Sequence, residues 1–125
     1  MTNTSQSLTR WDKELQVPKS YFGITEEEKQ LITNGCGSEG FLEKIIPDNL
    51  IGLDVAESCN IHDWMFHHAK NKHDYKVADE TFLENLNAQI KDQGSSLITL
   101  VRKGMAYLYF LVVRAYSSLK GATDK

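Results

Sequence analysis

The sequence predicts an all-α domain with three main helices. Apolar residues recur at helical spacing in three segments, which cover about residues 53–69, 75–91 and 97–120. Glycine, serine, asparagine or aspartate separates these segments, as is typical of helix ends and turns. Only a few residues connect the first two segments, so we expect them to form a pair of long antiparallel helices.

Size and composition indicate a single globular domain, residues 1–125. With 41% hydrophobic and 25% charged residues, the chain lies near the averages of soluble globular proteins, which excludes a disordered or fibrous chain. The net charge is -3 and no segment concentrates basic residues, so no nucleic-acid partner is expected. The two cysteines, Cys36 and Cys59, are too few for a four-thiolate zinc site and allow one disulfide.

The N-terminal residues 1–24 are mostly polar, with isolated apolar residues such as Leu15 and Val17. We expect this segment to be a loose arm or a short amphipathic helix. Residues 1–10 have neither a basic head nor an apolar run, so no secretory signal is expected in this numbering. Either the protein stays inside the cell or a leader is missing.

A short helix and a glycine-rich loop are expected next. Thr25 and Glu28 have the spacing of a capping box, so a helix should begin there and run toward Thr33. Residues 34–40 then contain three glycines, which favour a turn over a helix or a strand.

The first two long helices each have one apolar stripe. The stripe of the first helix, about residues 53–69, consists of Val55, Cys59, His62, Met65, Phe66 and Ala69. The second helix, about residues 75–91, should begin after Asp74 as its N-cap and end before Gly94. Its stripe consists of Ala78, Phe82, Leu83, Leu86 and Ile90.

The third long helix, about residues 97–120, is the most apolar part of the chain and should be capped by Ser95 or Ser96. We expect its inward face to comprise Leu100, Gly104, Tyr107, Leu108, Leu111, Ala115 and Tyr116. Charged residues interrupt the apolar run, and its longest uncharged stretch is residues 104–113. A bilayer needs about 20 apolar residues, which argues against a membrane span.

Two polar residues, His62 and Asp79, lie on the otherwise apolar stripes. A buried carboxylate is costly unless it is paired, and an imidazole is the nearest partner expected on the facing helix. We therefore predict that His62 and Asp79 meet across the antiparallel pair. The alternative is that such a pair has a purely structural role.

Asp63 follows His62 but lies about 100° further round the helix, so it needs a different partner. A carboxylate and the carbonyls of a glycine-rich loop are ligands that Ca²⁺ prefers, so Asp63 and residues 34–40 form a candidate calcium site. A disulfide between Cys36 and Cys59 would tether that loop near His62. The alternatives are a plain connector with Asp63 in solvent, or a transition-metal site of Asp63, His67, His68 and His73.

These residues resemble the core of the phospholipase A2 superfamily. The family motif, a cysteine, two residues and then His-Asp, corresponds to Cys59, His62 and Asp63. Asp79 stands where the family has the aspartate that holds its catalytic imidazole. Residues 34–38 (Asn-Gly-Cys-Gly-Ser) most resemble the calcium loop of the group XII-like secreted phospholipases A2, and the resemblance covers about residues 34–86.

The resemblance implies a Ca²⁺-dependent enzyme that hydrolyses the sn-2 ester of glycerophospholipids at a membrane or micelle surface and releases a fatty acid and a lysophospholipid. It also implies that the protein is secreted. His62 would be the general base on water, and Asp79 would orient its imidazole. The calcium ligands that the resemblance implies are Asp63, Gly35, Gly37 and Gly40. The alternative is a non-catalytic member of the family that binds lipid or a protein partner.

The chain departs from the family pattern at several positions. Phe66 stands where the family usually has a tyrosine that donates to the supporting aspartate, so we expect Tyr75, Tyr107 or Tyr109 to donate to Asp79 instead. Ser38 and Glu39 replace tighter glycine spacing in the loop. Secreted members carry many disulfides, whose bracing the third long helix would replace. The residues expected to line an acyl slot or an interface, or else to belong to the core, are Trp64, Phe41, Leu42, Tyr21 and Phe22.

Overall fold

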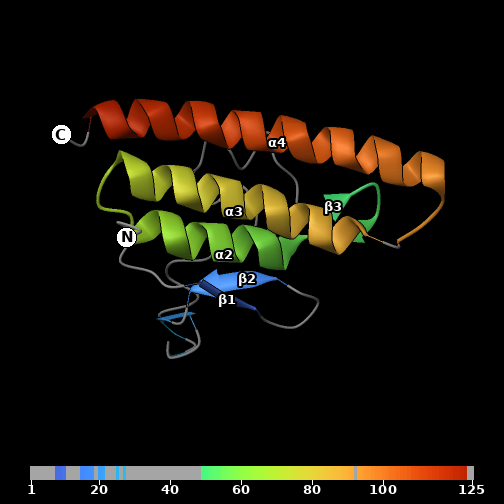
Figure 1. The fold of residues 1–125 in the computed structure, drawn as a ribbon, viewed down its shortest axis with the longest axis horizontal. Coiled ribbons are helices and arrows are strands. Elements are labelled where there is room, and N and C mark those ends of the chain that lie inside the picture. Colours follow the sequence, from blue (N-terminus) through green and yellow to red (C-terminus); the bar gives the residue numbers. More distant parts are fainter. Residues whose placement is uncertain are drawn as a thin grey trace.

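The computed structural model describes residues 8–10, 15–18, 20–21, 25, 27, 49–91 and 93–123. The main helices of this part of the chain are α2 (Ala56–His67), α3 (Lys72–Ile90) and α4 (Ser96–Thr123). The helix α3 lies in the middle and contacts both α2 and α4, and α4 runs antiparallel to it (Figure 1). The mostly helical class and the three long helices that the sequence predicts are therefore confirmed.

Two small antiparallel hairpins, which the sequence analysis did not predict, accompany the helices. One pairs β1 (Leu8–Arg10) with β2 (Gln16–Pro18), and the other pairs β3 (Asn49–Leu50) with β4 (Leu53–Asp54). The turn between β3 and β4 has positive φ at Ile51 (50°) and Gly52 (84°). Positive φ at both central residues is typical of the type I′ turn, whose twist matches that of the strands.

The N-terminal segment is not a loose arm where the structure describes it. Leu15, Val17 and Tyr21 are buried in a hydrophobic cluster with residues of α2 and α3. Asn85 of α3 holds β2 in place: the Gln16 N–H donates to Asn85 Oδ1 at 2.8 Å, and Asn85 Nδ2 donates to the Gln16 carbonyl at 3.0 Å. The isolated apolar residues of this segment are therefore anchors in the core, and β2 replaces the expected amphipathic helix.

The segment between the two hairpins lies largely outside the described residues. Of the short helix expected after Thr25, the structure describes only Thr25 and Glu27. The glycine-rich loop of residues 34–40 is not among the described residues.

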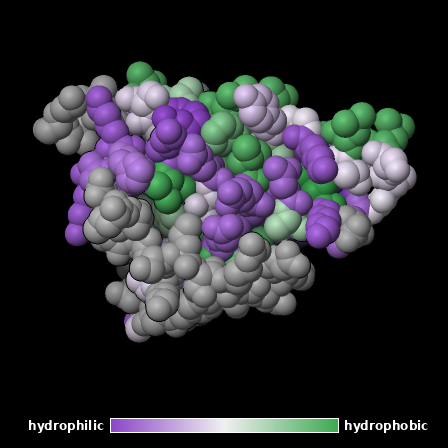
Figure 2. All heavy atoms as spheres, in the orientation of Figure 1, coloured by the Kyte–Doolittle hydropathy of each residue, from purple (hydrophilic) through white to green (hydrophobic). Residues whose placement is uncertain are grey.

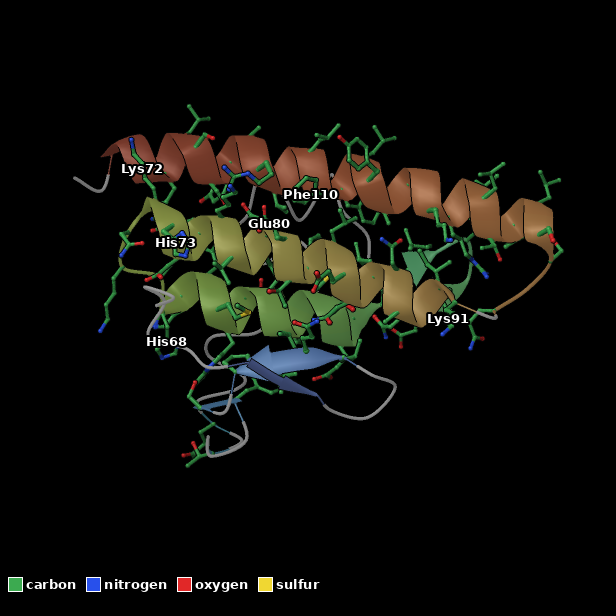
Figure 3. All side chains as sticks on the ribbon, viewed as in Figure 1. His68, Lys72, His73, Glu80, Lys91 and Phe110 are labelled. Carbon is green, nitrogen blue, oxygen red and sulfur yellow. The ribbon has the colours of Figure 1, made fainter. Side chains whose placement is uncertain are left out.

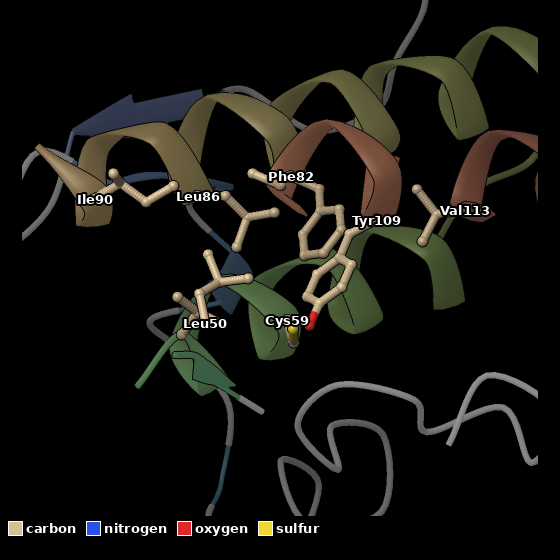
Figure 4. Packing of buried hydrophobic residues seen from close by; sticks show 9 residues of the cluster. Leu50, Cys59, Phe82, Leu86, Ile90, Tyr109 and Val113 are labelled. Carbon is tan, nitrogen blue, oxygen red and sulfur yellow. The ribbon is translucent and has the colours of Figure 1, made fainter. Parts of the chain in front are cut away.

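A second hydrophobic cluster fills the space between α2, α3 and α4 (Figure 4). Its labelled members are Leu50, Cys59, Phe82, Leu86, Ile90, Tyr109 and Val113. The Tyr109 hydroxyl donates to the Asn49 carbonyl at 3.4 Å, and burial raises the pKa of Tyr109. Most residues of the apolar stripes predicted for α2 and α3 are buried.

The helix caps differ in part from the expectation. Asn71, and not Asp74, caps α3, because its side-chain oxygen accepts from the Asp74 N–H at 2.8 Å. Asp74 lies in the first turn of α3, is buried, and accepts from the Lys70 N–H at 2.9 Å. Ser95 caps α4 as predicted, with its hydroxyl oxygen accepting from the Ile98 N–H at 3.2 Å.

The predicted inward face of α4 is wrong. Four of its expected members are between 44% and 68% exposed, namely Leu100, Tyr107, Leu108 and Leu111. The residues of α4 that are buried instead are Ala106, Tyr109, Val113 and Ser117. The larger apolar residues of α4 are concentrated on the side that faces away from Arg102 and Arg114, and both arginines contact the rest of the fold, so the apolar periodicity indicated the exposed side.

The length and apolar composition of Ser96–Lys120 are sufficient for a membrane crossing, by these two criteria only. By these criteria the charged residues do not exclude a membrane span, contrary to the argument in the sequence analysis. In the structure, however, two arginines of α4 make polar contacts with the rest of the fold. Arg102 donates to the carbonyls of Leu50, Gln93 and Ile51 at 2.8, 2.8 and 2.7 Å, and Arg114 binds Asp79.

We expect Arg102→Lys to lower the free energy of unfolding by about 1–2 kcal/mol, because an ammonium cannot reproduce the planar guanidinium that reaches three carbonyls. Urea denaturation measures this change. Lys103→Ala, at the exposed neighbouring position, is the control and should change stability by less than about 0.5 kcal/mol. Equal effects of the two substitutions would contradict an anchoring role for Arg102.

Candidate active site

A buried histidine and a buried aspartate face each other across the two antiparallel helices α2 and α3. His62 Nε2 lies 2.6 Å from Asp79 Oδ1, and the two residues are 8% and 0% exposed. His62 comes from the middle of α2, and Asp79 comes from the second turn of α3. The inward stripes of both helices therefore bring into contact the two polar residues that interrupt them.

Arg114 of α4 is the second partner of Asp79, and the sequence analysis missed it. Its Nη1 donates to Asp79 Oδ2 at 2.9 Å. Two of the three expected tyrosine donors lie elsewhere: Tyr107 is exposed, and the Tyr109 hydroxyl donates to the Asn49 carbonyl. A single arginine within the apolar run of α4 was the available signal, because a charge inside an apolar segment usually has a partner.

The partners of Asp79 determine how the imidazole of His62 can act. A carboxylate paired with a guanidinium accepts hydrogen bonds only, so Nε2 of His62 carries the hydrogen of this contact. The neutral imidazole then has its lone pair on Nδ1, which makes no hydrogen bond with the described residues. Nδ1 is therefore the atom of this pair that can take up a proton.

Aromatic rings surround the imidazole of His62. The ring centroid of Phe82 lies 4.8 Å from that of His62, and the centroid of Phe66 lies 5.7 Å from it. Phe66 also contacts Tyr75, with the centroids 4.7 Å apart. Packing on both helices thus fixes the plane of the imidazole, which is a requirement for directed proton transfer.

The candidate calcium site is only partly described. Asp63 is half-buried on α2, directly after His62. The other expected ligands, Gly35, Gly37 and Gly40, lie outside the described residues. Cys59, one turn before His62, is disulfide-bonded, and the sequence contains one other cysteine, Cys36.

The transition-metal alternative finds no support in the geometry. All four of its residues are described, and no group of three His, Cys, Asp or Glu side chains in the described part of the chain can hold a metal ion. His68 instead has Nδ1 2.9 Å from the Trp64 carbonyl, and its ring packs on the Trp64 ring. Figure 3 shows His68 and His73 at the end of the molecule where α2 leads into α3.

The two described aromatic residues expected in an acyl slot or the core belong to the core. Trp64 is 4% exposed and donates through Nε1 to the Ser20 hydroxyl at 2.9 Å. Tyr21 packs edge-on against Trp64, and its hydroxyl donates to Glu57 at 2.7 Å. The remaining residues of that expectation lie outside the described residues, namely Phe22, Phe41 and Leu42.

Comparison with known proteins adds no relative. No protein-family model, curated protein or solved structure matches this chain. The fold and the site define a small helical protein in which an imidazole, a carboxylate and a guanidinium from three helices meet in the interior.

We expect Asp79→Ala to lower the free energy of unfolding by about 3 kcal/mol, because it leaves His62 and Arg114 without their shared partner. The Arg114 side chain is partly exposed and keeps part of its hydration, so the expected loss lies at the lower end of the range for a broken buried ion pair. Glu80→Ala, on the next residue, removes only an exposed pair with Lys76 at 4.0 Å and should cost less than about 0.5 kcal/mol. Chemical denaturation of both variants measures the difference, and similar losses would refute the central role of Asp79.

Proposed function

We propose that this protein is a Ca²⁺-dependent phospholipase A2-type hydrolase that cleaves the sn-2 ester of glycerophospholipids. The observation that carries the proposal is the 2.6 Å contact between His62 Nε2 and Asp79 Oδ1. This contact joins two antiparallel helices, and Asp63 directly follows the histidine in the Cys-x-x-His-Asp motif. The proposal therefore rests on the order of these residues in the sequence and on the contact between His62 and Asp79.

The His62–Asp79 pair suits hydrolysis by an activated water molecule. In the proposed reaction, Nδ1 of His62 takes a proton from water, and the water oxygen attacks the ester carbonyl carbon. The bond between that carbon and the glycerol oxygen then breaks, and the proton on Nδ1 passes to the departing oxygen. Asp79 keeps Nε2 as the donor atom and offsets the positive charge that the imidazole gains.

Arg114 is a positioning residue in this proposal. The usual tyrosine of the phospholipase family donates a hydrogen bond to the supporting aspartate, but Phe66 has no group that could donate to Asp79. The guanidinium of Arg114 donates instead, to the carboxylate oxygen that His62 does not contact. With both carboxylate oxygens held, the plane of Asp79 and hence that of the imidazole is fixed. The chain therefore replaces a tyrosine from the central helices by an arginine from α4.

The Asp63 carboxylate would hold the calcium ion together with the carbonyls of Gly35, Gly37 and Gly40, an all-oxygen ligand set of the kind Ca²⁺ prefers. When bound, the ion supplies polarisation of the ester carbonyl and stabilisation of the negative charge that forms on its oxygen. The disulfide of Cys59 supports this assignment. Its only possible partner within the chain, Cys36, belongs to the glycine-rich segment in sequence, so the bridge would tie that segment to α2 one turn before His62.

The exposed side of α4 supports a phospholipid surface as the partner. Large apolar side chains cover this side, namely Leu97, Leu100, Val101, Tyr107, Leu108, Leu111 and Leu119. Figure 2 shows apolar surface along the edge of the molecule that α4 forms. The helix has no acidic residue, and two of its four basic residues, Arg102 and Arg114, make contacts within the fold, so it is the apolar side chains that favour binding at a membrane interface.

The same apolar side of α4 favours the second candidate function, a non-catalytic module that binds lipid. A large exposed apolar patch needs a partner whether or not the protein hydrolyses that partner. The two candidate functions differ only in whether the protein hydrolyses the phospholipid that it binds.

We expect the protein to hydrolyse mixed-chain phosphatidylcholine in vesicles and to release the fatty acid from the sn-2 position. His62→Gln should reduce the rate by about 100-fold or more, because it removes the proton acceptor. His67→Gln, an exposed histidine on the same helix, is the matched control and should leave the rate unchanged. Fatty-acid release, followed by mass spectrometry, measures all three proteins.

The calcium part of the proposal is tested in the same assay. Chelation of Ca²⁺ and the substitution Asp63→Asn should each abolish hydrolysis, with restoration by added Ca²⁺ in the wild-type protein only. Hydrolysis that persists in chelator would exclude the calcium scheme. Vesicle binding without any hydrolysis by the wild-type protein would favour the non-catalytic module.

We also expect the double substitution Leu100→Ser and Leu108→Ser to weaken binding to vesicles of phosphatidylcholine and phosphatidylglycerol by about tenfold or more, because two exposed leucines no longer enter the lipid. Vesicle co-sedimentation measures the binding. Ile51→Ser, which removes an apolar side chain that is 46% exposed outside α4, is the matched control. Unchanged binding of the α4 variant would show that this side does not contact lipid.

A further inference from the structure

A small cavity lies between the first turn of α3 and the C-terminal part of α4. Its volume is about 130 Å³, and its lining residues are Lys72, Tyr75, Arg114, Ser117 and Ser118. This is roughly the volume of four water molecules in the liquid, enough for a tetrahedral oxyanion. Two of the five lining side chains are cationic and none is acidic, so the cavity favours an anion.

The two cationic side chains retain hydrogen-bond donors for such an anion. A guanidinium has five N–H groups, and within the described residues Arg114 makes one hydrogen bond, to Asp79. Lys72 is exposed, and among the described residues it forms no ion pair. Figure 3 shows its side chain reaching from the start of α3 to the C-terminal part of α4.

Ser117 supplies an independent observation. The residue is 3% exposed, and its buried hydroxyl has no hydrogen-bond partner in the described part of the chain. A buried hydroxyl without a partner is destabilising and uncommon, and it is often explained by a ligand or ordered water. Ser117 lines the cavity beside Arg114, so rotation of its side chain would bring the hydroxyl to a ligand oxygen there.

We propose that this cavity binds a phosphate group. Phosphate oxygens accept several hydrogen bonds at once, which matches the unused N–H groups of Arg114, the ammonium of Lys72 and the hydroxyl of Ser117. Lys72 is also the first residue of α3, a helix of 19 residues whose N-terminal end favours negative charge. The phosphate group is that of inorganic phosphate or of a lipid headgroup, and the proposal does not depend on ester hydrolysis.

The test is thermal unfolding of the whole chain in inorganic phosphate, compared with chloride at equal ionic strength. At ten times Kd, phosphate should raise the unfolding midpoint by about 4–8 °C in the wild-type protein. Lys72→Gln and Ser117→Ala should each weaken binding by about tenfold, measured by titration calorimetry. Lys76→Gln, an exposed lysine one turn further along α3 that does not line the cavity, is the matched control and should bind like wild type.

Ser117→Ala separates a ligand site from a structural defect. In chloride, this variant should be as stable as the wild-type protein or more stable, because it removes a buried hydroxyl without a partner. In phosphate, it should lose most of the stabilisation. If Ser117→Ala does not fold, Lys72→Gln still tests the site, because Lys72 is exposed and its substitution should also weaken phosphate binding.

The source of the phosphate group is distinguished by a second ligand, glycerophosphocholine. If glycerophosphocholine stabilises the protein and this stabilisation depends on Ser117, the ligand is a lipid headgroup. If only inorganic phosphate stabilises the protein, the ligand is free phosphate. Both outcomes support the phosphate cavity. Equal stabilisation of all variants, or no response of the wild-type protein to either ligand, would overturn it.

Discussion

The buried carboxylate of Asp79 is the feature on which the arrangement of the three helices depends. It is fully buried on α3 and bound by His62 from α2 and by Arg114 from α4. A buried charge without partners costs several kcal/mol, so each outer helix must keep its partner within reach of the carboxylate. This contact couples the relative positions of all three helices to the geometry of the candidate active site.

The arginines of α4 also explain its exposed apolar side. Arg114 must face Asp79, and Arg102 must face the carbonyls of Leu50, Ile51 and Gln93, so the rotation of the helix about its axis is determined by polar contacts. Small or medium residues such as Ala106 and Val113 pack toward α3, and the leucines of α4 are left outside. The surface proposed to contact lipid is thus a consequence of the contacts that hold the site.

Arg114 connects the two proposed sites. One of its N–H groups binds Asp79, and the same side chain lines the small cavity with Lys72 and Ser117. An anion in this cavity would contact the same guanidinium that the Asp79 carboxylate binds. A guanidinium between two anionic groups is stabilised by both, because its five N–H groups are arranged to bind more than one acceptor at a time.

The sequence alone determined the helical class, the three long helices and the inward position of His62 and Asp79, because both polar residues lie at helical spacing from apolar residues that are buried in the core. It did not determine the rotation of α4, whose larger apolar residues face away from the core, or the pairing of Arg114 with Asp79, 35 residues apart in sequence. It also missed β2, whose Gln16 pairs with Asn85 of α3. Contacts between distant residues decided these features, and local patterns of residue type do not specify which distant residues meet.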